Sequence, residues 1–181
     1  MISNLRGASV LLALAISSPF AAPQSPAPAA TVQATTGVLN AAEATKLLPS
    51  AVFFRGQSAS VQTRNSGGVR FNKNAVMLTT LVDTSGYSTQ VQEKYQAYLI
   101  TETPLSIDGH RLEPGAYGVG FIANDSFIVM DIGGHDLFTA HTEKDPALRR
   151  PSPLQVLAAP GSSDHYRIYS GRTFVSFTAA Q

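Results

Sequence analysis

Residues 51–82 read AVFFRGQSASVQTRNSGGVRFNKNAVMLTTLV, and this stretch decides the fold class. Within it, residues 59–64 alternate between small or apolar and polar side chains, a period of two that indicates a β-strand with one buried face. The segments 65–68 and 72–74 consist largely of Asn and Gly and predict turns. The run 76–82 is apolar almost throughout, which predicts a strand covered on both faces.

The same pattern recurs toward the C-terminus, where Asp108-Gly109 and Gly133-Gly134 are turn dipeptides between apolar segments. Helices do not alternate with the strands, so a doubly wound α/β fold is not expected. The sequence predicts an all-β fold, namely an antiparallel β-sandwich or barrel of about ten short strands with one short N-terminal helix. Further strands are expected at residues 95–103, 105–107, 116–122, 127–132, 137–142, 154–157, 166–169 and 173–177.

The N-terminal helix is predicted from a capping box. Asn40 and Glu43 have the required spacing, and residues 41–48 are good helix formers that end at Pro49. Single helical turns are also expected from Thr89 and at Asp145-Pro146, where Asp can cap the turn and Pro can take its first position.

Residues 1–22 have the layout of a secretory signal peptide, because Arg6 precedes an apolar run of residues 10–16 and small residues follow. The run is shorter than the roughly 20 residues that span a bilayer. We therefore expect export to the periplasm or the exterior, with cleavage somewhere in residues 21–29. Residues 23–37, rich in Pro, Ala and Thr, are expected to be a disordered linker, and residues 38–181 a single β-domain.

Composition narrows the classes of partner. The chain has no cysteine, so its stability is expected to come from burial and hydrogen bonds. Its 13 Lys and Arg exceed its 12 Asp and Glu by one, and removal of Arg6 with the leader leaves a formally neutral domain. A neutral domain lacks the positive field that attracts nucleic acid. We expect no nucleic-acid partner, no stable membrane span, no metal and no cofactor, and a small molecule or an envelope protein as partner.

Residues 105–119, LSIDGHRLEPGAYGV, combine an Asp-Gly turn, a Leu-x-Pro-Gly turn and a following tyrosine. This phrase resembles a strand–turn–strand segment of small secreted bacterial β-domains of unknown function. The resemblance covers only these residues. It implies the fold and export, and it assigns no catalytic residue.

Four residues are candidate ligand contacts. Arg55, Arg64 and Arg70 could line a groove for an anionic or sugar-like ligand, or they could form the polar face of an exposed sheet. Tyr117 could belong to a carbohydrate platform or to the core. These residues, with no converging catalytic set, favour a non-enzymatic ligand-binding or envelope-accessory module. Nearby Gly118 and Gly120 share a strand face, and they are expected to admit a large ring from a neighbouring strand or to allow sheet curvature.

Two other functions are left open by the sequence. His135, Asp136 and His141 are the weak catalytic candidates of a metal-assisted hydrolase. The histidines are six residues apart, so one straight strand would hold them about 20 Å from each other, and only a bend could bring them to one metal. A Gly-Gly hairpin turn with solvated histidines is the simpler interpretation. Alternatively, an exposed sheet edge could add a strand from a partner protein.

Overall fold

The computed structural model describes residues 36–180, so the expected leader and most of the expected linker lie outside the described residues. Within this range the chain forms fourteen strands in two antiparallel sheets and only two short helices. The predicted all-β antiparallel fold is confirmed. The number of strands exceeds the expected ten because several have only two or three residues, among them β1 (Gly37–Leu39), β7 (His110–Leu112) and β11 (Glu143–Lys144).

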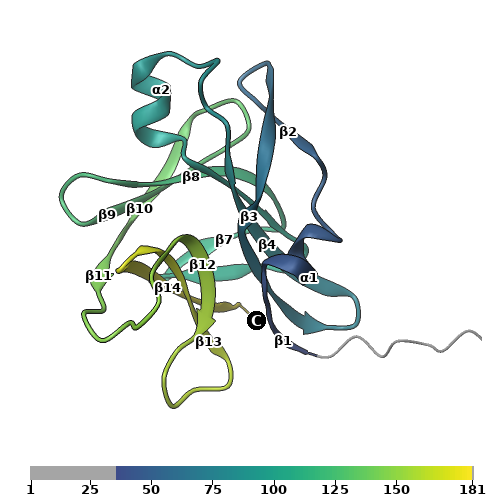
Figure 1. Ribbon diagram of the computed structural model, residues 1–181, viewed down its shortest axis with the longest axis vertical. Helices are drawn as coiled ribbons and strands as arrows, with labels where there is room; N and C mark the ends of the chain where they lie inside the picture. Colours follow the sequence, from purple (N-terminus) through teal and green to yellow (C-terminus); the bar gives the residue numbers. More distant parts are fainter. Residues whose placement is uncertain (1–35, 181) are drawn as a thin grey trace, which may run out of the picture. The chain divides into compact units, whose positions relative to one another are not determined.

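The larger sheet has the strand order β1-β3-β4-β5-β8-β9-β10, with β2 paired to the outer part of β3 (Figure 1). All of its pairings are antiparallel, and tight turns connect several neighbours, as predicted from the turn dipeptides. Its further strands are β2 (Ala51–Phe54), β3 (Gln57–Asn72), β4 (Ala75–Val82), β5 (Ala97–Thr101), β8 (Gly115–Ile122), β9 (Ser126–Met130) and β10 (Asp136–His141).

The smaller sheet has the order β12-β13-β14-β6-β7, and β11 pairs with β14. The β6–β7 hairpin turns at Asp108-Gly109, as the sequence predicts, and the C-terminal hairpin joins β13 to β14. The remaining strands are β6 (Leu105–Ile107), β12 (Ser152–Ala158), β13 (His165–Gly171) and β14 (Thr173–Ala179).

The two sheets bury one shared apolar core, which makes the fold a β-sandwich. The larger sheet contributes Val69, Met77, Leu99, Val119 and Val129, and the smaller sheet contributes Ile107, Val156, Ile168, Val175 and Phe177. Apolar clusters also cover the other face of the larger sheet. This explains the apolar run of β4: Met77 enters the shared core, Leu78 packs toward helix α1 (Ala41–Thr45), and Val82 joins an aromatic cluster around Phe54.

The predicted turn at residues 65–68 is wrong, because β3 runs straight through it. The pairing of β3 with β4 shifts register between Gln62 and Ser66, so the irregularity precedes the two glycines, which pair in register with Thr79 and Leu78. The glycines serve close packing instead. A Cβ on Gly67 would lie 3.0 Å from the backbone nitrogen of Val156, so the missing side chain lets β3 approach β12 of the other sheet.

Both helices are short. In α1, the Asn40 side chain accepts hydrogen bonds from the Ala42 and Glu43 amides (2.9 and 3.1 Å), and the Glu43 carboxylate accepts from the Asn40 amide (2.9 Å), so the predicted capping box is confirmed. The helix ends at Thr45 rather than at residue 48. Helix α2 (Thr89–Lys94) begins where the helical turn was predicted. Asp145-Pro146 forms a hydrogen-bonded turn and no helix.

Candidate functional site

A pocket of about 360 Å³ opens where three segments meet: the β2–β3 turn, helix α2 and the β9–β10 turn. Figure 1 shows α2 and the β2–β3 hairpin at the same end of the domain. We call it the β2–α2 pocket. Its polar lining comes from Arg55 on the first segment, from Gln90, Glu93 and Lys94 on α2, and from Asp136 on β10. Of the residues that the sequence singled out, Arg55 and Asp136 are the two that line it.

Arg55 occupies an unusual backbone position. The β2–β3 turn is Arg55-Gly56, with φ of 48° and 79°, which is the left-handed region at both residues. Among residues 36–180, three other non-glycine residues have positive φ, namely Asp108, Asn124 and Asp125, and all are of the types that tolerate it. The Arg55 amide is held by a 2.8 Å hydrogen bond to the Ile132 carbonyl. Positive φ at both residues is the geometry of a two-residue type I′ hairpin turn, whose first residue is more often Asn, Asp or Gly than Arg.

The Arg55 side chain lies against Gly134 in the β9–β10 turn. A Cβ on Gly134 would collide with the Arg55 side chain, coming within 2.6 Å of its Cγ and 3.0 Å of its Nε, and Gly134 has a φ of 86°. The predicted Gly133-Gly134 turn is confirmed, because the Gly134 amide donates to the Asp131 carbonyl (3.0 Å). Gly134, which lacks a side chain, also leaves room for Arg55. Within the part of the chain that the structure describes, the Arg55 guanidinium has no hydrogen bond or ion pair, so it is available to an anion.

Besides Arg55, the pocket has an ion pair of Lys94 with Asp136 and a separate carboxylate, that of Glu93. Lys94 Nζ lies 2.6 Å from Asp136 Oδ2, and both side chains are about half exposed, so they neutralise each other. The Glu93 carboxylate, which is exposed, has no ion pair or hydrogen bond among residues 36–180. Gln96, two residues after helix α2, ties the end of the helix to β8. Its side-chain Nε2 donates to the Phe121 carbonyl (2.9 Å), and its Oε1 accepts from the Phe121 amide (3.0 Å).

The floor of the pocket is apolar and rigid. It is formed by Phe54, Val91 and Met130. The Phe54 ring is fully buried and stacks on Tyr95 with 3.9 Å between centroids. Gly118 of β8 lies directly under the Phe54 ring, where any Cβ would clash, so the prediction that Gly118 admits a large ring is confirmed. Gly120 admits the Lys94 carbonyl in the same way, and no ring.

The remaining arginines and Tyr117 lie elsewhere. Arg64 lines a hollow of about 220 Å³ beside α1, and Arg70 lines one of about 410 Å³ near Tyr166, so the three arginines do not form one groove. The Tyr117 hydroxyl donates to the Glu113 carbonyl (2.8 Å), and its half-buried ring packs on the shared core. Burial raises the pKa of this hydroxyl, with a smaller contribution from Glu113.

The histidine cluster does not converge. His135 Nδ1 pairs with Asp131 (2.9 Å), Asp136 pairs with Lys94, and the His141 amide donates to Asp108 (2.8 Å). Among residues 36–180, no three His, Cys, Asp or Glu residues gather as a metal would require. The hydrolase interpretation therefore gains no support from the geometry.

The loop that carries Ser162, Asp164 and His165 forms a local hydrogen-bond network. Ser162 Oγ contacts His165 Nδ1 (2.9 Å) and Asp164 Oδ1 (2.8 Å), and it accepts from the His165 amide (3.2 Å). Because the serine and the aspartate meet the same ring nitrogen, the aspartate does not orient the ring from its far side as a catalytic triad requires. The network holds the loop between β12 and β13 in a turn.

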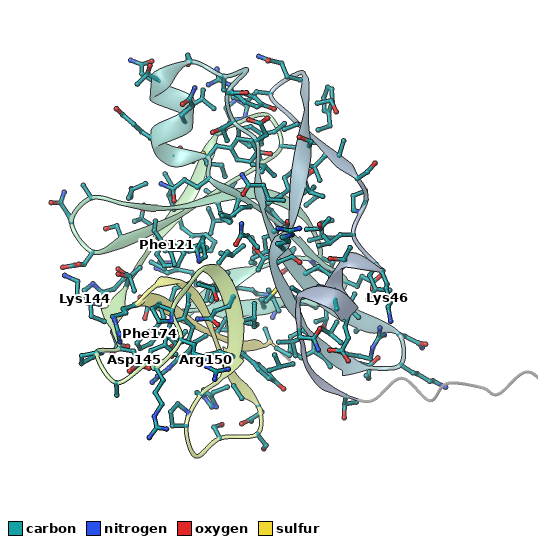
Figure 2. The ribbon with its side chains drawn as sticks, in the orientation of Figure 1. Lys46, Phe121, Lys144, Asp145, Arg150 and Phe174 are labelled. Atoms are coloured by element: carbon teal, nitrogen blue, oxygen red, sulfur yellow. The ribbon has the colours of Figure 1, made fainter. Side chains whose placement is uncertain are left out.

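A second charged cluster is structural. Arg167 stacks over the Phe174 ring, 4.0 Å from its centroid, and approaches Asp145 at 3.7 Å; Figure 2 labels Asp145 and Phe174. The Tyr169 hydroxyl donates to the same carboxylate (3.0 Å). These side chains contact one another on the smaller sheet, although the buried Arg167 Nε has no hydrogen-bond partner among residues 36–180.

The sheet edges carry features that discourage strand addition. The edge strand β10 has a bulge at Leu137, and Asp108 occupies the outward amide of His141. At the other sheet, β12 contains Pro153 and a register shift, and β7 has three residues. Short, bulged or proline-containing edges resist pairing with another chain. These edges weigh against the interaction-domain interpretation.

Comparisons of the chain with protein-family models, with curated proteins and with solved structures found no match. The resemblance of residues 105–119 therefore stays a prediction. Neither of the helices in residues 36–180 has the length and hydropathy needed to cross a bilayer. The sequence missed Gln90, Glu93 and Lys94 as site residues, because a polar segment of ordinary composition gives no sign of facing a distant turn.

Proposed function

We propose that this chain is an exported, non-enzymatic binding domain that holds a small molecule with an anionic group in the β2–α2 pocket. The observation that carries the proposal is Arg55, whose guanidinium has no partner among residues 36–180 and whose side chain leaves a tight turn, packs on Gly134 and lines a pocket with an apolar floor. Arg6 and the apolar run of residues 10–16 that follows it support export.

The pocket has the features of a ligand site. Its volume is near the lower end of the usual range of about 300–1,000 Å³, and a few polar groups surround an apolar base. An arginine fork binds a carboxylate or phosphate through two parallel hydrogen bonds, which gives orientation as well as affinity. Because the Arg55 backbone is held by its bond to Ile132 and its stem packs on Gly134, binding has to order only the end of the side chain.

The experiment is a thermal-shift screen of the purified protein against small carboxylates, sugar acids and phosphate monoesters. We expect at least one class of anion to raise the melting temperature, and we expect Arg55→Gln to abolish that rise. Arg55→Lys should keep part of it, because the charge remains while the planar fork is lost.

Arg64→Gln and Arg70→Gln are matched controls, since each of these arginines lines a different hollow. Both variants should respond to the anion as the unmodified protein does. Loss of the response in Arg70→Gln with retention in Arg55→Gln would place the ligand elsewhere. If no anion stabilises the protein at millimolar concentration, the proposal fails.

A further inference from the structure

We infer that the ligand of the β2–α2 pocket is a zwitterion, with a carboxylate and an ammonium group joined by an apolar segment. This inference rests on the proposed function and specifies the chemistry of the ligand. An ω-amino acid is the simplest molecule of this class.

The charge balance of the pocket argues for two ligand charges. Four charged side chains line it, and Lys94 and Asp136 are paired with each other at 2.6 Å. This leaves one cation, Arg55, and one anion, Glu93, that have no partner within the described residues 36–180. A ligand with a single negative charge would satisfy Arg55 and be repelled by Glu93, whereas a zwitterion satisfies both.

The positions of Arg55 and Glu93 determine where each end of the ligand binds. Arg55 projects from the β2–β3 turn and rests on the β9–β10 turn, while Glu93 belongs to α2, so the two charges come from different walls. The floor between these segments is formed by Phe54, Met130 and Val91, which offer no hydrogen-bonding side chain. Phe54 and Met130 are buried and Val91 is partly exposed, so a methylene chain would lie chiefly against Val91 with a charged group at each end.

The size of the pocket agrees with a short ligand. A volume of about 360 Å³ equals the liquid volume of roughly a dozen water molecules. A chain of about six carbons with two charged ends fits within it, and the amide of Gln90, also on the lining, can bond either end.

The test compares three probes of one length, namely 6-aminohexanoate, hexanoate and 1-hexylamine, by isothermal titration calorimetry. We expect 6-aminohexanoate to bind at least about tenfold more tightly than hexanoate or hexylamine, because each charged hydrogen bond contributes to that extent. Glu93→Gln should remove the advantage over hexanoate, and Arg55→Gln should remove the advantage over hexylamine. Glu143→Gln, on an exposed residue of β11 that does not line the pocket, is the matched control because it removes the same charge elsewhere on the domain.

The outcomes separate this inference from the proposed function. Equal binding of hexanoate and 6-aminohexanoate, lost together in Arg55→Gln, would overturn the zwitterion and leave the anion site standing. Equal binding of hexylamine and 6-aminohexanoate would overturn both. If none of the three binds at 10-millimolar concentration, the zwitterion with a six-carbon body is refuted, and the anion screen decides the proposed function by itself.

Discussion

Gly118→Ala is the substitution that tests the base of the pocket most sharply. The added methyl group would collide with the edge of the Phe54 ring, since a Cβ at this position would lie 2.9 Å from Phe54 Cζ and 3.0 Å from Cδ2, and closer still to Cε2. The ring cannot retreat easily, because it is fully buried and stacks on Tyr95.

The magnitude follows from two opposing effects. Overpacking of a rigid core costs about 1–3 kcal/mol of unfolding free energy. Replacing Gly by Ala restricts the unfolded chain and returns about 0.4–1 kcal/mol. We therefore expect a net loss of about 1–2 kcal/mol, which lowers the melting temperature by roughly 3–8 °C in a domain of this size.

The assay is urea unfolding followed by circular dichroism and by tyrosine fluorescence, which is suitable because the chain has no tryptophan. Gly86→Ala is the matched control. Its φ lies outside the left-handed region, and the nearest atom to an added Cβ is Gln57 Oε1 at 3.6 Å, so its stability should be unchanged or slightly raised. In a Phe54→Leu background the smaller side chain should reduce the cost of Gly118→Ala.

Two results would refute this reasoning. Equal stability of Gly118→Ala and Gly86→Ala would mean that the ring does not press on β8. A full, additive cost of Gly118→Ala in the Phe54→Leu background would mean that the clash lies with another group.

Three further substitutions test other parts of the fold. Asn40→Ala should destabilise the domain by about 1 kcal/mol in urea unfolding, because it removes the cap of α1; an unchanged midpoint would contradict this. Tyr95→Phe should stabilise it by about 1 kcal/mol, since the buried hydroxyl has no partner in residues 36–180; a loss of stability would show that the hydroxyl is bonded. The amide of His135 lowers the pKa of Asp131, so this stabilisation is present above the ordinary value of 3.8 and is lost as the pH falls below it. Asp131→Asn should flatten that part of the acid-unfolding profile, and an unaltered profile would contradict it.

The strands were largely predictable from sequence because a period of two, interrupted by turn dipeptides, is a local signal. Asp108-Gly109 and the capping box at Asn40 are confirmed for the same reason. The Gly-Gly pair at residues 67–68 predicted a turn where β3 continues. Glycine marks a turn and a close approach between sheets equally well, and the neighbour that decides between them, Val156, is about 90 residues away.

The site was predictable only in part. Arg55 was predicted as a candidate ligand contact, and it does line the pocket. Three arginines within 16 residues suggested one groove. In the structure, Arg55 in the β2–β3 turn and Arg64 and Arg70 in β3 line three different hollows. Glu93 could not be found, because its role depends on the packing of α2 beside a turn some 40 residues earlier in the chain.

The location of the ligand is the central claim, and amide chemical-shift mapping tests it most directly. The uniformly ¹⁵N-labelled domain would be titrated with 6-aminohexanoate. The account predicts that the largest shifts cluster at residues 54–56, 90–94 and 130–136, the three segments around the β2–α2 pocket. Largest shifts around Arg70 and Tyr166, or shifts spread evenly over both sheets, would contradict it.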